Sequence, residues 1–359
     1  MENGLVQTNF EVETQFFTYP SSFIVPVWAQ GFDCFKEKCG FCCLTEKPNE
    51  VQGVHHETLN RPICKLYELK QRLCKKYPIR PELCKSYPFF LGVEAGRVIA
   101  SLNLECPGSN GNKCVPKTKL EDTFNTAYWS RRITLLNDWY EKAVLSPFLW
   151  HNAERDRYNI SDWVKEFYAM KKCFPYVDKV REIIFQKLNE QNGQNIPEVI
   201  PPIPISEISK DLTGAYIATR FESFSLGLLE SKGTKLKMLF FDENMSVLKR
   251  TQFLAPSCFK ELELDKDAHN LLIDYISLLL NRPFTSLAVA LSGYNQEQVA
   301  SNFISGLSGA LALLEGSANI IALRDKLTTI DKDTMREIIS FCEGNVISGF
   351  MRPDIQKYF

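Results

Sequence analysis

The segment FDCFKEKCGFCC, residues 32–43, has four cysteines within ten residues and constrains the fold of this chain more than any other feature. The chain has 359 residues and 12 cysteines, and nine of the cysteines lie between Cys34 and Cys114. The N-terminal residues lack a basic segment followed by an apolar one, so we expect no signal peptide and a reducing, cytoplasmic location. There, clustered cysteines indicate a metal or redox site more often than disulfides.

The first thiol group contains one compact metal-binding pattern. Cys39 and Cys42 form a Cys-x2-Cys turn, which directs two thiolates at one metal, and Gly40 lets backbone amides approach the sulfurs. Adding Cys34 gives the C-x4-C-x2-C spacing that also occurs in plant-type ferredoxins. Cys43 directly follows Cys42 and points elsewhere, so we expect it at a second site or at another edge of the same cluster.

The later thiols are single residues. Cys64, Cys74 and Cys84 recur every ten residues, and Cys106 follows in the sequence Glu-Cys-Pro-Gly. Eight thiols therefore precede residue 107, enough for two four-cysteine sites or for one site with spare thiols. Cys114 is a possible spare.

The middle of this region is strongly basic. Residues 61–85 hold eight basic side chains, opposed only by Glu68 and Glu82. Cationic neighbours lower the pKa of thiols and compensate a negative metal–thiolate centre. A solvated helix face or a nucleic-acid patch are alternative interpretations.

The ordered combination of motifs resembles the YkgJ-type cysteine-cluster family, known for a CxxCxxCC putative zinc- or iron-chelating domain. The resemblance covers about residues 32–110. The matching positions are Cys34, Cys39, Gly40, Cys42, Cys43, Cys64, Cys74, Arg80, Pro81, Cys84, Tyr87, Pro88, Phe89, Cys106, Pro107 and Gly108. It implies a metal centre ligated by Cys34, Cys39, Cys42, Cys43, Cys64, Cys74, Cys84 and Cys106.

The resemblance leaves the metal open between iron and zinc. Structural zinc sites commonly use two Cys-x2-Cys turns, whereas this chain has one such turn and scattered single thiols, which favours an iron–sulfur cluster, expected as [4Fe–4S]. Zinc is the alternative, and a metal-free thiol redox protein is a third. The flagellin lysine N-methylases form a distant branch of the same family, but no glycine-rich nucleotide loop follows a strand here.

Other side chains have weaker patterns. Arg80 and Tyr87 are candidates for hydrogen bonding around the cluster, although their prolines alone explain a turn. His55 and His56 are expected in a loop rather than as ligands. We expect Cys342 and the tryptophans of the helical segments, such as Trp129, to be buried in the core.

The chain as a whole predicts an α+β fold. We expect a small cysteine-rich metal-binding domain (1–117), a helical middle segment (118–190), a Pro/Asn/Gln linker (191–206) and an α+β C-terminal portion (207–359). Residues 87–106 predict a β-hairpin that turns at Glu94–Arg97. We expect three or four further strands after the linker.

The last third predicts helices at 266–281, 295–315, 317–327 and 332–343, the last of them capped by Asp331 or Asp333. Residues 299–323 are long enough to span a membrane. Ser, Asn and Gly residues and the interruption at Glu315-Gly316 instead favour two buried helices.

Three functions remain open on the sequence. The first is an iron–sulfur protein with a redox or cluster-dependent catalytic role, acting with an unidentified protein or redox partner. The second is a zinc-stabilised interaction module, and the third is a lysine methyltransferase-like modification enzyme. The net charge of -1 gives no indication of a nucleic-acid partner, and we expect no membrane partner.

Overall fold

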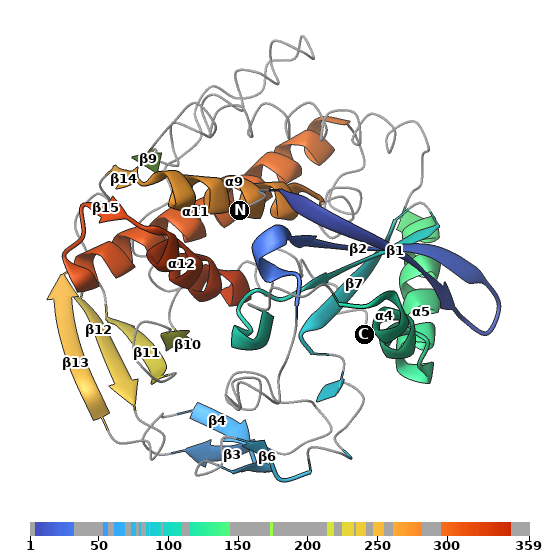
Figure 1. The fold of residues 1–359 in the computed structure, drawn as a ribbon, viewed down its shortest axis with the longest axis horizontal. Coiled ribbons are helices and arrows are strands. Elements are labelled where there is room, and N and C mark those ends of the chain that lie inside the picture. The colour runs from blue at the N-terminus through green and yellow to red at the C-terminus, as the bar shows by residue number, and fades with distance from the viewer. Residues whose placement is uncertain are drawn as a thin grey trace.

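The computed structural model describes residues 4–31, 53–56, 61–68, 73–76, 79, 84–85, 87–94, 96–109, 115–143, 173–174, 214–218, 225–232, 235–241, 247–254, 261–281 and 296–345. The fold is α+β, as the sequence predicts, with an N-terminal sheet packed by helices (Figure 1). The domain boundaries stay predictions, and the linker 191–206 lies outside the described residues.

The N-terminal sheet has four strands in the order β1-β2-β8-β7. β1 (Leu5–Glu13) and β2 (Thr18–Pro26) form an antiparallel hairpin. β2 also pairs in parallel with β8 (Arg97–Leu102), with Ser21 opposite Val98, and β8 pairs in antiparallel with β7 (Phe89–Glu94). The parallel pairing joins two segments separated by residues 27–96, so the cysteines from Cys34 to Cys84 belong to the long connection between β2 and β7.

The predicted hairpin at residues 87–106 is confirmed. Glu94 lies opposite Arg97, and the two apolar runs become β7 and β8. Gly96 has φ +71°, a conformation that a residue with a Cβ rarely adopts, so the turn requires glycine here.

Two helices cover the N-terminal sheet. α4 (Lys117–Phe124) and α5 (Ala127–Ala143) confirm the helical pattern predicted after residue 118. The Phe124 ring lies 5.5 Å from the ring of Phe10 on β1 and 5.2 Å from that of Trp129, between ring centres. Trp129 is buried, as predicted. The remaining predicted helical residues are outside the described ranges except for Cys173–Phe174, which form the strand β9 rather than helix.

The C-terminal portion contains a meander of four antiparallel strands, within the predicted three or four. These are β10 (Gly214–Ala218), β11 (Ser225–Lys232), β12 (Lys235–Phe241) and β13 (Val247–Leu254). A small sheet follows in which β14 (Leu262–Leu264) lies between β9 and β15 (Thr329–Ile330).

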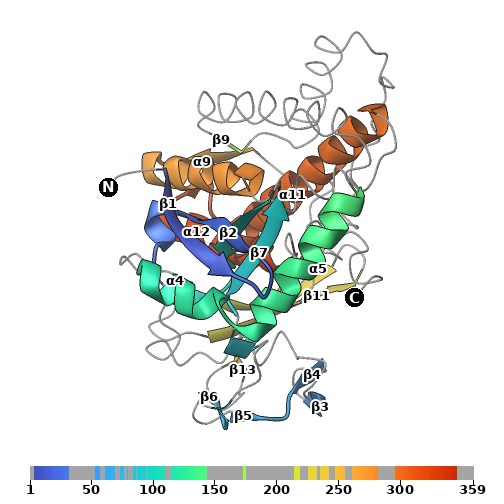
Figure 2. The ribbon, with the colours of Figure 1, turned by 90° about the vertical axis from the view of Figure 1, so that its right-hand side faces the viewer.

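Helices α9 (Lys266–Asn281) and α12 (Lys332–Asn345) confirm two predicted helices. The side chain of Asp331 caps α12 by accepting a 2.8 Å hydrogen bond from the Thr334 N–H, which confirms one of the two predicted caps. α9 lies beside β1 and β2 (Figure 2). One buried cluster contains side chains from the N-terminal sheet, α4, α5, α9, α11 and α12, so the first and last parts of the chain share a core.

The prediction of two helices at 295–315 and 317–327 is wrong. The structure has one continuous helix, α11 (Gln296–Asp325). Glycine in a helix interior costs only about 1 kcal/mol, and residues 313–322 are buried, so packing outweighs that cost. The Ser317 hydroxyl and the Asn319 amide donate to backbone carbonyls of the preceding turn, which satisfies two polar side chains inside the core. None of the helices in the described ranges combines the length and apolar character that crossing a bilayer requires.

Candidate metal centre

The structure describes four of the eight predicted thiol ligands, namely Cys64, Cys74, Cys84 and Cys106. Cys34, Cys39, Cys42, Cys43 and Arg80 lie outside the described residues. None of the four described thiols forms a disulfide. Thiols in this state have the chemistry of metal ligands.

Cys64 and Cys74 belong to two small hairpins that follow one another. β3 (Gly53–His56) pairs with β4 (Arg61–Cys64), which places Gly53 opposite Cys64. β5 (Tyr67–Glu68) pairs with β6 (Leu73–Cys74), which places Tyr67 opposite Cys74. These hairpins lie together at the lower end of the molecule in both views (Figures 1 and 2).

A hydrogen bond brings the two cysteine-bearing segments together. The N–H of Lys75, directly after Cys74, donates to the carbonyl of Leu66, two residues after Cys64, at 2.8 Å. Cys64 is buried and Cys74 is half-buried. This hydrogen bond joins the segments that carry the two cysteines, and the shared metal site of Cys64 and Cys74 stays a prediction.

Cys106 lies in a hydrogen-bonded turn after β8. Its N–H donates to the carbonyl of Asn103 at 3.1 Å, and the Asn103 side chain accepts from the N–H of Glu105 at 2.9 Å. The hydroxyl of Ser109 donates to the Cys106 carbonyl at 2.6 Å, within the short helix η3 (Pro107–Ser109). Cys106 is buried, so a side chain that is reactive in water is held out of water here.

Helix α12 holds this turn from the other end of the chain. The carboxylate of Glu343 accepts from the N–H of Leu104 at 3.2 Å and from the hydroxyl of Tyr275 on α9 at 2.5 Å. The Ser340 hydroxyl donates to the carbonyl of Glu105 at 3.3 Å. Sequence reasoning missed these three side chains, because contacts between positions 68 to 239 residues apart leave no local pattern.

Cys84 and Tyr87 lie in the segment directly before β7, close to the turn that follows β8. The carbonyl of Pro88 accepts from the N–H of Asn103 at 2.8 Å, and Phe89 lies opposite Leu102. The segment that carries Cys84 and the turn that carries Cys106 therefore extend from the same end of the β7–β8 hairpin. The two residues predicted to hydrogen-bond around the cluster, Arg80 and Tyr87, keep that role as a prediction.

The four described thiols thus lie on two parts of the fold, Cys64 and Cys74 on the two small hairpins and Cys84 and Cys106 on the segments that flank the β7–β8 hairpin. Within the described ranges, no three His, Cys, Asp or Glu side chains gather as a metal site would require. His55 and His56 lie in strand β3, opposite Pro62 and Arg61, rather than in the predicted loop. Cys342 is buried in the core, as predicted.

Comparison with known proteins adds no relative: no family model, no curated protein and no solved structure matches this chain. The resemblance to the YkgJ-type family stays a prediction that rests on the motif residues.

Proposed function

We propose that this chain is a metal–thiolate protein whose N-terminal cysteines bind an iron–sulfur cluster with a redox or cluster-dependent catalytic role. The observation that carries the proposal is the set of four described cysteines outside disulfides, two of them on neighbouring hydrogen-bonded hairpins, preceded by the four-thiol run of residues 34–43. Such a donor set fits iron–sulfur ligation because all ligands are thiolates from separate short segments. A bound cluster would supply one-electron transfer.

The residues of the chain have distinct parts in this proposal. Cys64, Cys74, Cys84 and Cys106 would bind metal together with the four upstream thiols, and eight thiols are enough for two four-cysteine sites. Burial of Cys64 and Cys106 would limit access of water to the centre. Lysine directly follows Cys64, Cys74 and Cys84, and the cationic side chains at 65, 75 and 85 are exposed, so they would offset the negative charge of thiolates without entering the core.

Zinc is the second candidate, because the small size of two strands calls for a bound metal without requiring a cluster. Strands β5 and β6 have two residues each, and a hairpin of that size is not stable by itself in water. A metal bound to Cys64 and Cys74 would stabilise both small hairpins, and zinc does this as well as a cluster does. In that case the region would be a folded interaction module without redox chemistry.

The deciding measurement is the content of iron, zinc and acid-labile sulfide per chain after anaerobic purification, together with the visible absorption spectrum. Iron with matching sulfide and a brown colour supports the proposal. A colourless protein with stoichiometric zinc replaces it with the interaction module. Cys342→Ser is the matched control, because Cys342 is a buried cysteine outside the motif and should leave the metal content unchanged.

A further inference from the structure

Three exposed lysines and one exposed isoleucine gather beside Cys64 and Cys74. Lys65, Lys75 and Lys76 are exposed, and the side chain of Ile79 is 73% exposed. We call these four residues the lysine patch. An exposed isoleucine among lysines is notable because it offers an apolar contact within a charged surface.

The hydrogen bonds of the hairpins place these residues together. Tyr67 lies opposite Cys74, and the Lys75 N–H donates to the carbonyl of Leu66, so the register continues one step beyond the strands. Lys65 directly precedes Leu66 and Lys76 directly follows Lys75, so this hydrogen bond brings the backbone of the three lysines close together. The N–H of Ile79 donates to the carbonyl of Lys76 at 3.0 Å, which folds Ile79 back toward the lysines in a turn.

The lysine patch has a positive charge, although the net charge of the whole chain is slightly negative. The side chain of Glu68 lies 3.5 Å from that of Lys75, and it is the one acidic residue described between positions 61 and 85. The chain as a whole has a net charge of -1, so the surplus of eight basic over two acidic residues in 61–85 is local. A local field of this kind selects an anionic partner at one place on the surface.

The chemistry of the patch favours a polypeptide over a nucleic acid. Nucleic-acid surfaces use exposed aromatic side chains for stacking and arginine for bidentate contacts. In the described part of this region the exposed cations are lysines, and the aromatic ring of Tyr67 is buried. Lysines around one aliphatic side chain match an acidic protein segment that carries an apolar residue.

We propose that the lysine patch docks an acidic polypeptide segment of a partner protein beside the thiols of Cys64 and Cys74. The proposal rests on the proposed function only in taking these thiols as part of the centre that the partner serves. Binding itself depends on the surface charge and on Ile79, and it requires no particular metal.

The test measures binding of fluorescent poly-L-glutamate to the full-length protein by anisotropy, at low and at physiological ionic strength. The patch variant is Lys65→Glu/Lys75→Glu/Lys76→Glu. The control variant is Lys117→Glu/Lys119→Glu/Lys266→Glu, which makes the same change of charge at exposed lysines of α4 and α9. The match is close, because Lys117 lies 3.5 Å from Glu121 as Lys75 does from Glu68, and the two lysine side chains are 57% and 55% exposed.

We expect wild type to bind with an affinity that falls as salt rises, and the patch variant to lose about tenfold in affinity while the control variant keeps it. Absence of binding by wild type, or an equal loss in both variants, would overturn the proposal. A single-stranded thymidine oligonucleotide of equal charge is the second probe, and tighter binding of this probe at the patch would overturn it in favour of a nucleic acid. Metal analysis on the same sample separates the two questions: patch-dependent binding by a protein that purifies without metal would leave the docking surface standing and remove the proposed metal function.

Discussion

Glu343 on helix α12 accepts a 3.2 Å hydrogen bond from the backbone N–H of Leu104, a residue 239 positions earlier in the chain. The Glu343 carboxylate is fully buried, and its other oxygen accepts from the hydroxyl of Tyr275. A buried carboxylate with these two donors fixes the backbone two residues before Cys106. The C-terminal helices thus determine the local structure around a candidate ligand of the N-terminal motif.

Replacing Glu343 with glutamine should loosen the Cys106 turn. Glutamine keeps the shape of the carboxylate but has one accepting oxygen where the carboxylate uses two, and it also loses the charge, so we expect a loss of about 2 kcal/mol in the free energy of unfolding. Iodoacetamide should then alkylate Cys106 faster in the metal-free folded protein, as followed by mass spectrometry.

Glu337→Gln is the matched control for that experiment. Glu337 is also a fully buried glutamate of α12, but its partner is Arg324 and it does not contact the turn. We expect a comparable loss of stability with unchanged Cys106 alkylation under conditions where both variants are folded. If both variants expose Cys106 equally, the effect is global unfolding and Glu343 has no specific part in holding the turn.

Local sequence patterns correctly predicted the helices and hairpins that are determined by residues close together in the chain. The hairpin around Gly96 and the bounds of α9 follow from alternation, turn chemistry and helical periodicity within about 20 residues. The break expected at Glu315-Gly316 does not occur, because burial of the surrounding helix decides its continuity. The pairing of β2 with β8 and the contact of Glu343 with Leu104 depend on distant residues, so the sequence alone contains no signal for them.

Asp274 on α9 should make stability depend on pH. Burial raises the pKa of Asp274 to about 7, and a hydrogen bond from the backbone of Gly4 opposes that shift. An aspartate in the unfolded chain titrates near pH 4. Between about pH 4 and pH 7 the folded state therefore keeps a proton that the unfolded state has released, and stability falls as pH rises through this window.

The expected loss across that window is on the order of 4 kcal/mol, at about 1.4 kcal/mol for each pH unit. Asp274→Asn should remove this slope and make the protein more stable than wild type at pH 8, because asparagine carries no charge to bury and still accepts from Gly4. Urea unfolding at a series of pH values measures how the free energy of unfolding changes with pH in each variant. Asp122→Asn, at an exposed position on α4, should keep the wild-type profile, and an unchanged slope in Asp274→Asn would show that another group titrates.

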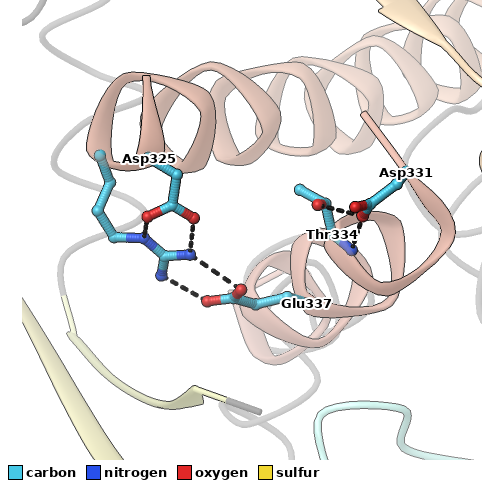
Figure 3. A network of polar contacts seen from close by, with 5 residues as sticks. Asp325, Asp331, Thr334 and Glu337 are labelled. Carbon is cyan, nitrogen blue, oxygen red and sulfur yellow. Dashed lines mark hydrogen bonds and ion pairs between the residues drawn. The ribbon is translucent and has the colours of Figure 1, made fainter. Parts of the chain in front are cut away.

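A buried ion network joins α11 to α12. The guanidinium of Arg324 donates two hydrogen bonds to Glu337, at 2.5 and 2.9 Å, and two to Asp325, at 2.8 and 2.6 Å (Figure 3). The Arg324 side chain is 3% exposed and that of Glu337 is fully buried. Arg324→Ala would leave Glu337 charged without a counterion in the core, so we expect a loss of about 3–5 kcal/mol in urea unfolding.

The double variant Arg324→Met/Glu337→Leu tests how much of that loss is an unpaired charge. It removes both buried charges together, and Asp325 is 17% exposed and can be hydrated. We expect the double variant to be within about 1–2 kcal/mol of wild type. A double variant as unstable as Arg324→Ala would instead mean that the ion network itself provides the stability.

Paired cysteine substitutions should resolve how the described thiols share metal. Cys64 and Cys74 lie in the small hairpins at one end of the molecule, whereas Cys106 lies in a turn that α12 holds, and no three acidic, histidine or cysteine side chains gather within the described ranges. We therefore expect Cys64→Ser/Cys74→Ser and Cys84→Ser/Cys106→Ser each to retain about half of the wild-type metal, because a four-ligand site does not survive the loss of two ligands while a separate site does. Metal content per chain is the measurement, with Cys342→Ser as the reference. Complete loss of metal in both double variants would show that all four thiols serve one centre, and full retention in either would remove that pair from the ligand set.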